Sequence, residues 1–149
     1  LRAFKSVEHR IEFVRTVDDV RYYNDSKATN TDSAIKALEA FDGHIILIAG
    51  GDDKLTDLTE FMALVHARVD ELILVGDATE RFAAAALDAG LTAEHIHRAG
   101  YHMEEAVRIV HELAAPPQTV LLSPACASFD MYGGYEERGR DFKRIVNEL

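Results

Sequence analysis

The sequence of 149 residues has a single cysteine, a shortage of basic residues and no long hydrophobic run, and each shortage argues against a class of protein. Cys126 has no partner for an internal disulfide, which fits a reducing compartment. No apolar run approaches the roughly 20 residues that span a bilayer. The net charge of −10 disfavours nucleic acid or an acidic membrane as a partner. We therefore expect a soluble, cytoplasmic protein whose anion sites, if present, are local.

We also expect no secretory leader, because the first residues do not resemble one: no charged stretch is followed by an apolar one. The chain starts at Leu1 rather than Met, and residues 1–8 have little pattern, so we expect a piece of a longer protein. The length is that of one ordinary domain, and 48% hydrophobic residues suffice for a proper core. A single domain over residues 1–149 is predicted.

Short apolar segments of strand length alternate with segments of helical spacing. Strands are predicted at residues 11–17, 20–23, 44–49, 71–75, 95–98 and 119–122, and helices at 31–41, 57–67, 79–88, 103–113 and 136–149. The Asp18-Asp19 turn between the first two strands predicts an antiparallel hairpin. The nearly continuous apolar run at 44–49 is typical of a strand covered on both faces.

This alternation predicts an α/β domain, Rossmann-like and three-layered. Its sheet is expected to be mainly parallel with about six strands, an N-terminal antiparallel hairpin and helices on both faces. The helical spacing also places Leu87, Leu113 and Leu149 on buried helix faces, together with their apolar neighbours.

The most informative segment is 24–30, Asn-Asp-Ser-Lys-Ala-Thr-Asn, which joins the second strand to the first helix. Lys27 adds an ammonium group to a helix start, where free backbone N–H groups already attract anions. The same polar residue types are also common caps and turn residues, so both interpretations stay open from the residues alone. Asp25 is harder to explain as packing.

Ligands of open α/β sheets bind beyond the carboxyl ends of the strands. The loops expected there are 24–30, 50–54, 76–79 and 123–135. Three of them carry unusual polar residues, and we expect Lys27, Thr29, Lys54 and Ser128 to face one cleft. The order of residues in 50–54 is not that of a phosphate-binding P-loop, which needs Gly-Lys-Ser/Thr before the helix.

Histidines and the cysteine give weaker signals. His95, His97 and His102 are the densest group of histidines, but no ligand spacing is completed, so packing or surface roles and no metal site are predicted. Cys126 lacks an evident base and is expected to be a small buried residue. His9, with Arg10, is interpreted either as part of an exposed edge pair or as a cation that reaches a ligand.

Several ordered motifs are spread over nearly the whole chain. They are His9-Arg10-x-Glu12, the segment Asn24 to Asn30, Ile48-Ala49-Gly50-Gly51 with Lys54, the segment Ser123 to Asp130, and Glu137-Arg138-Gly139 with Phe142. Together they resemble the Mur ligases, of the type that adds D-glutamate to UDP-N-acetylmuramoyl-L-alanine. The resemblance implies ATP-driven amide formation in peptidoglycan precursor synthesis. The substrate carboxylate is phosphorylated, and the amine of D-glutamate attacks the acyl phosphate.

The resemblance also implies roles for individual residues. Arg10 and Asp25 would bind ATP, and Lys27 would bind its phosphate end and act as the catalytic cation. The residues implied for D-glutamate are Thr29, Lys54, Ser128, Phe129 and Tyr135.

The family's P-loop, magnesium ligands and uridine-binding domain do not occur in these residues. The resemblance therefore implies a C-terminal domain that packs against the central ATPase domain of its own chain, with an N-terminal UDP-binding domain beyond it. ATP and Mg²⁺ are the implied cofactors, with the Mg²⁺ ligands in the central domain. D-glutamate, ATP and UDP-N-acetylmuramoyl-L-alanine are the implied partners, without nucleic acid or membrane, and a monomer is expected.

Two alternatives remain. One is another amino-acid-adding Mur ligase or a folylpolyglutamate-type ligase. The residues of segment 24–30 argue against this alternative. The other is a non-catalytic ligand-binding module, because a fold does not fix a function. Lys27 and Lys54 weigh against that module, which has no need of both at one end of the sheet. The isolated domain is expected to be inactive.

Overall fold

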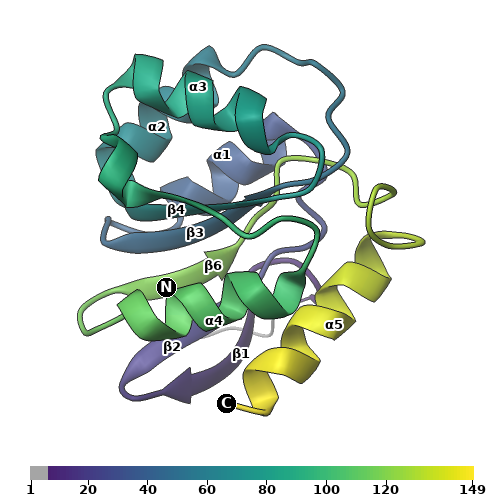
Figure 1. Ribbon diagram of the computed structural model, residues 1–149. Coiled ribbons are helices and arrows are strands. Elements are labelled where there is room, and N and C mark those ends of the chain that lie inside the picture. The colour runs from purple at the N-terminus through teal and green to yellow at the C-terminus, as the bar shows by residue number, and fades with distance from the viewer. Residues whose placement is uncertain (1–6) are drawn as a thin grey trace.

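The computed structural model describes residues 7–149, so residues 1–6 of the predicted single domain lie outside the described part. One six-stranded sheet carries helices on both faces (Figure 1). The strands are β1 (Glu12–Val17), β2 (Val20–Asn24), β3 (Ile45–Gly50), β4 (Val69–Val75), β5 (Ile96–Arg98) and β6 (Thr119–Leu122). The helices are α1 (Thr31–Glu39), α2 (Thr59–Arg68), α3 (Thr79–Ala89), α4 (Met103–Leu113) and α5 (Tyr135–Asn147), with a 3₁₀ turn, η1, at Ala93–His95.

The sheet has the strand order β1-β2-β6-β3-β4-β5. β1 and β2 pair antiparallel, and every other neighbouring pair is parallel. Asp18 and Asp19 have φ angles of 51° and 63°, as the tight turn of a right-twisted hairpin requires. The predicted fold class is confirmed. The last strand, β6, lies between β2 and β3, which brings the loops after these three strands together.

Two hydrophobic cores lie on opposite faces of the sheet. α1, α2 and α3 cover one face and α4 and α5 the other (Figure 1). Successive residues of β3 alternate between them: Leu47 and Ala49 face the α1–α3 core, whereas Ile46 and Ile48 face the α4–α5 core. This double coverage explains why β3 is apolar throughout.

Three predictions of buried leucines were wrong. Leu87, Leu113 and Leu149 are 46%, 37% and 37% exposed. Leu113 is the last residue of α4 and Leu149 lies beyond the end of α5. Neither side chain is therefore covered by the elements that bury the rest of its helix. Leu87 points about 100° around α3 from its buried neighbour Ala86. Within residues 7–149, no helix combines the length and apolar character needed to cross a bilayer.

Candidate functional site

Hydrogen bonds join the loops that follow β2, β3 and β6. The backbone N–H of Ala125 donates to the carbonyl of Ala28 over 2.9 Å, and that of Asp52 donates to the carbonyl of Ala127 over 2.9 Å. The loop after β4 is attached in turn, because the N–H of Ala78 donates to Gly51. Each of the predicted residues Thr29, Lys54 and Ser128 lies within two positions of one of these bonds. The predicted gathering of the loops at one end of the sheet is therefore correct.

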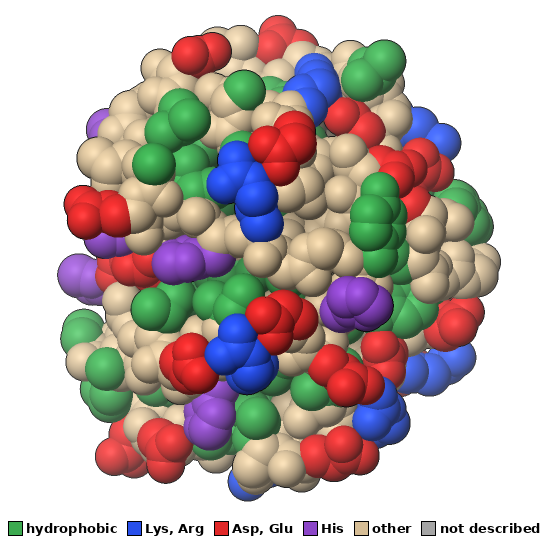
Figure 2. Space-filling view, in the orientation of Figure 1, with side chains coloured by type: hydrophobic (Ala, Val, Ile, Leu, Met, Phe, Trp, Pro, Cys, Tyr) green, Lys and Arg blue, Asp and Glu red, His purple; other side chains and the backbone are tan. Residues whose placement is uncertain are grey.

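A cavity of about 160 Å³ lies between the start of β1, the loop after β2 and α1. Arg10, Lys27 and Lys36 line it together with Asp25 and Ser33. Figure 2 shows acidic and basic side chains interspersed over the face that it draws. The chain carries a net charge of −10, yet three cations and one carboxylate line this cavity, which is therefore locally basic. Such a cavity suits an anion.

Lys36 and Ser33 are additions that the sequence analysis missed. Both belong to α1, where their spacing of three residues places them on one helix face. The sequence signal for them is this helical spacing: residues three apart on the helix that follows segment 24–30 lie on the same face. Asn30 caps the same helix, because its side-chain oxygen accepts from the N–H of Ser33 over 2.9 Å.

Asp25 is 4% exposed, and its carboxylate is used within the chain. One oxygen accepts from the N–H of Ile11 over 3.0 Å, and the other from the hydroxyl of Ser123 over 2.7 Å. Burial raises the pKa of Asp25 to about 6, although these hydrogen bonds and the charge of Arg10 oppose the shift. The carboxylate thus ties the N-terminal segment to the loop after β6, and its role toward ATP stays a prediction.

Ser128 is buried, and its hydroxyl oxygen has no hydrogen-bond partner in the described part of the chain. A buried polar group left unpaired costs about 1–3 kcal/mol, so this hydroxyl is well suited to receive a ligand. Lys54 is exposed, with its ammonium 3.3 Å from a carboxylate oxygen of Asp52. Thr29 is half-buried. These three residues are not among those that line the cavity of Arg10 and Lys27, and their common cleft stays a prediction.

Phe129 and Tyr135 occupy the loop after β6 and the start of α5. Phe129 is 67% exposed. The carbonyl of Tyr135 accepts from the hydroxyl of Ser26 over 2.7 Å, and its ring lies edge-on to His9. The structure therefore places the backbone of Tyr135 against segment 24–30, while the side chain of Phe129 is directed to the surface.

The interpretation of His9 as part of an exposed edge pair was wrong. His9 is 3% exposed, and its Nδ1 lies 2.9 Å from the side-chain nitrogen of Asn24. Burial lowers the pKa of His9, which disfavours the cation that a ligand contact would need. His9 belongs to the packing between α5 and the hairpin. Arg10, by contrast, is exposed beside the cavity, as one interpretation expected.

Several histidines and carboxylates outside the candidate site have partners within the fold. His95 and His97 both contact the carboxylate of Glu71, at 2.9 and 2.8 Å. Glu8, His9 and Glu12 could hold a metal ion by their spacing, but Lys143 lies 2.9 and 3.2 Å from the two carboxylates and already offsets their charge. Cys126 is buried as predicted, and burial raises the pKa of its thiol to about 12.

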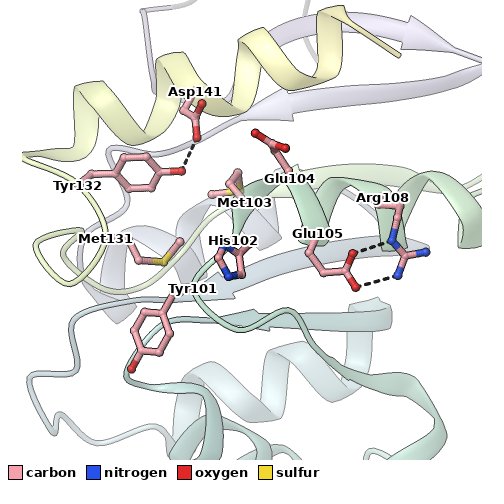
Figure 3. A pocket seen from close by; sticks show the side chains of 9 residues that line it. All are labelled: Tyr101, His102, Met103, Glu104, Glu105, Arg108, Met131, Tyr132 and Asp141. Atoms are coloured by element: carbon pink, nitrogen blue, oxygen red, sulfur yellow. Dashed lines mark hydrogen bonds and ion pairs between the residues drawn. The ribbon is translucent and has the colours of Figure 1, made fainter.

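A larger cavity of about 670 Å³ separates α4 from the loop before α5 and from α5 itself (Figure 3). Its charged groups are engaged, because Arg108 pairs with Glu105 and Asp141 accepts from the hydroxyl of Tyr132. None of the predicted site residues lines it. The candidate site is therefore the smaller cavity and the joined loops.

Comparison with known proteins assigns a family. The model of the "Mur ligase, glutamate ligase domain" matches residues 9–126. UDP-N-acetylmuramoylalanine–D-glutamate ligase of Clostridioides difficile is 48% identical over the whole chain, and that of Caldanaerobacter subterraneus is 46% identical. The chain spans about a third of each relative, 32% and 33% of their lengths.

Solved structures support the same fold. Folylpolyglutamate synthase of Mycobacterium tuberculosis superimposes with a TM-score of 0.64 over 92% of this chain and 32% of its own, at 16% identity. The bifunctional folylpolyglutamate synthase/dihydrofolate synthase of Yersinia pestis gives 0.62 over 95% of this chain and 32% of its own, at 14% identity. At this identity the likeness concerns the fold alone. The match of residues 9–126, more than half of the sequence, shows that the chain belongs to the Mur ligase family and contains its glutamate ligase domain.

Proposed function

We propose that this chain is the C-terminal domain of a ligase that adds D-glutamate to UDP-N-acetylmuramoyl-L-alanine with ATP. The observation that carries the proposal is the 46–48% identity, over all 149 residues, to relatives that bear this name. The central ATPase domain, with the P-loop and the Mg²⁺ ligands, and the UDP-binding domain would lie elsewhere in the longer protein. The domain would act in the cytoplasm, as part of a monomer.

The cationic cavity suits the phosphates of ATP. Arg10, Lys27 and Lys36 line it, and a nucleoside triphosphate carries several negative charges that three cations can offset. Lys27 would stabilise charge that develops during phosphoryl transfer. Asp25 lines the same cavity and would accept from the ribose hydroxyls.

D-glutamate brings two carboxylates, which need several donors. The buried hydroxyl of Ser128, which has no hydrogen-bond partner within residues 7–149, the half-buried Thr29 and the ammonium of Lys54 come from three loops that hydrogen bonds join. The backbone next to Phe129 and Tyr135 would supply further N–H donors. A pocket closed by the central domain would exclude water from the acyl phosphate, which would otherwise hydrolyse.

The alternatives are weaker. The folylpolyglutamate synthases share the fold at only 14–16% identity, whereas the relatives named for D-glutamate reach 46–48%. A binding module without a ligation role has no use for cations in both the cavity and the loop after β3.

The test uses the full-length protein of which this chain is a part. ATP-dependent phosphate release is measured with UDP-N-acetylmuramoyl-L-alanine and either D-glutamate, L-glutamate, L-alanine or no amino acid. Release that requires D-glutamate is expected. Lys54→Ala should raise the KM for D-glutamate at least 10-fold, because one carboxylate loses its cation.

Arg108→Ala is the matched control, since it removes an exposed cation of α4 that pairs with Glu105 and Glu112. Its KM for D-glutamate should stay within twofold of the wild-type value. Release that is indifferent to the amino acid would refute the proposed substrate. An unchanged KM for D-glutamate in Lys54→Ala would show that Lys54 does not belong to the pocket.

A further inference from the structure

Arg138 is a buried arginine that the sequence analysis quoted in a motif and left without a role. It lies on the first turn of α5 and is 2% exposed. Its guanidinium donates to the hydroxyl and the carbonyl of Ser26 over 2.9 and 2.7 Å, and to the carbonyl of Cys126 over 3.0 Å. These acceptors are neutral, so the charge is held within residues 7–149 by hydrogen bonds and not by a paired carboxylate.

The acceptors belong to the loops that carry the proposed pocket. Ser26 stands next to Lys27, and Cys126 stands two residues before Ser128. A third loop lies close to the guanidinium, because a Cβ added to Gly51 would be 3.4 Å from its Nη1. Arg138 therefore lies beneath the loops after β2, β3 and β6 at once.

The hydroxyl of Ser26 makes hydrogen bonds to two residues of α5. It accepts from Arg138 and donates to the carbonyl of Tyr135, so α5 is attached to segment 24–30 at two points. Lysine could not replace these contacts, because an ammonium lacks the planar fork that lets one side chain serve oxygens on two loops. A purely structural arginine would gain by placing its charge at the surface. Burial lowers the pKa of Arg138 to about 10.

We propose that Arg138 is a positioning residue for the D-glutamate pocket, setting the distance between the loop of Lys27 and Thr29 and the loop of Ser128. In this role Arg138 itself touches no substrate, and it acts through the hydroxyl and carbonyl of Ser26 and the carbonyl of Cys126. This inference rests on the proposed function. Misplacement of a binding group by about 1 Å can lower a rate about 100-fold. Loss of the contacts that Arg138 makes to the two loops should therefore change the kinetic constants measurably.

The experiment compares Arg138→Lys, Arg138→Met and wild type in the full-length protein. Arg140→Met serves as the control, because Arg140 is exposed on the same helix. Initial rates give KM for D-glutamate and for UDP-N-acetylmuramoyl-L-alanine. Both Arg138 variants should raise KM for D-glutamate 10- to 100-fold, with KM for the nucleotide substrate within twofold, whereas Arg140→Met changes neither.

KM does not depend on the folded fraction, so a variant that only loses folded protein lowers the apparent kcat and leaves KM unchanged. That outcome, or a KM within twofold of wild type in both Arg138 variants, would overturn the inference. Hydrogen exchange gives a second readout that needs no turnover. Amides of segments 24–30 and 123–130 should exchange faster in Arg138→Lys than in Arg140→Met, and equal exchange would also overturn it.

The two proposals fail separately. If wild-type turnover does not depend on D-glutamate, the proposed function is wrong whatever the variants do. If wild type requires D-glutamate and the Arg138 variants keep its KM, only the role of Arg138 is wrong.

Discussion

A buried carboxylate at the edge of the cavity gives the clearest expectation at the scale of single residues. Burial raises the pKa of Asp25 to about 6 from an ordinary value of 3.8. Well below pH 3.8 the group is protonated in the folded and unfolded states alike. As the pH rises toward 6, the unfolded state loses the proton first, so the folded state loses stability. A shift of this size corresponds to about 3 kcal/mol at neutral pH, as an order of magnitude.

Asp25→Asn removes this titration and keeps a group that can accept from Ile11 and donate to Ser123. Urea unfolding of the 149-residue chain between pH 4 and 8 is the measurement. The variant should gain stability relative to wild type as the pH rises from 4 to 7, by about 1–3 kcal/mol. The exposed Asp88→Asn is the control, and its difference from wild type should not change over this range. A constant difference for Asp25→Asn would show that its carboxyl titrates normally.

At the scale of elements, α5 packs closely against the hairpin of β1 and β2. Gly139 lies in α5, and a Cβ there would come within 2.2 Å of Nδ1 of His9 and 3.0 Å of the side-chain nitrogen of Asn24. Both neighbours are buried and hydrogen-bonded to each other, so they have little room to move. The absence of a side chain at Gly139 thus lets the helix approach β2.

Gly139→Ala should destabilise the chain by about 1–3 kcal/mol, the range of overpacked cores, although alanine is the better helix former by about 1 kcal/mol. Gly133→Ala is the control, since Gly133 is exposed outside the helix and its Cβ would meet only the flexible end of Glu137 at 3.0 Å. Urea unfolding should place the control within 0.5 kcal/mol of wild type, as is usual for a surface site. A Gly139→Ala variant as stable as wild type would mean that α5 shifts without cost.

For the molecule as a whole, the sheet separates two cores that should respond independently. Val65 of α2 and Val107 of α4 are both fully buried, on opposite faces. Val→Ala removes two methyl groups and leaves a cavity, which should cost about 2 kcal/mol at each site. Because the sites share no core, the double variant should lose the sum to within about 0.5 kcal/mol. Urea unfolding of the two single variants and the double variant gives the comparison, and a coupling above 1 kcal/mol would show that strain crosses the sheet.

Local sequence patterns were enough to predict the α/β class, the hairpin, the strands and helices, and the loops that carry polar residues. These features follow from local periodicity and turn chemistry, which neighbouring residues record. The motifs of segments 24–30 and 123–130 likewise predicted the family that residues 9–126 then matched. Lys27, Thr29, Lys54 and Ser128 could be selected because unusual polar residues recur after strands.

How these parts meet depends on contacts that appear only in the folded chain. The insertion of β6 between β2 and β3 depends on contacts between distant residues, and it brings the loops of Ala28 and Ala127 together. The burial of His9, the internal bonds of Asp25 and the position of Arg138 beneath three loops have the same origin. A side chain's partners and exposure are set by whatever packs against it, and for these residues the partners come from distant segments, such as Tyr135, which lies 126 positions from His9 in the chain.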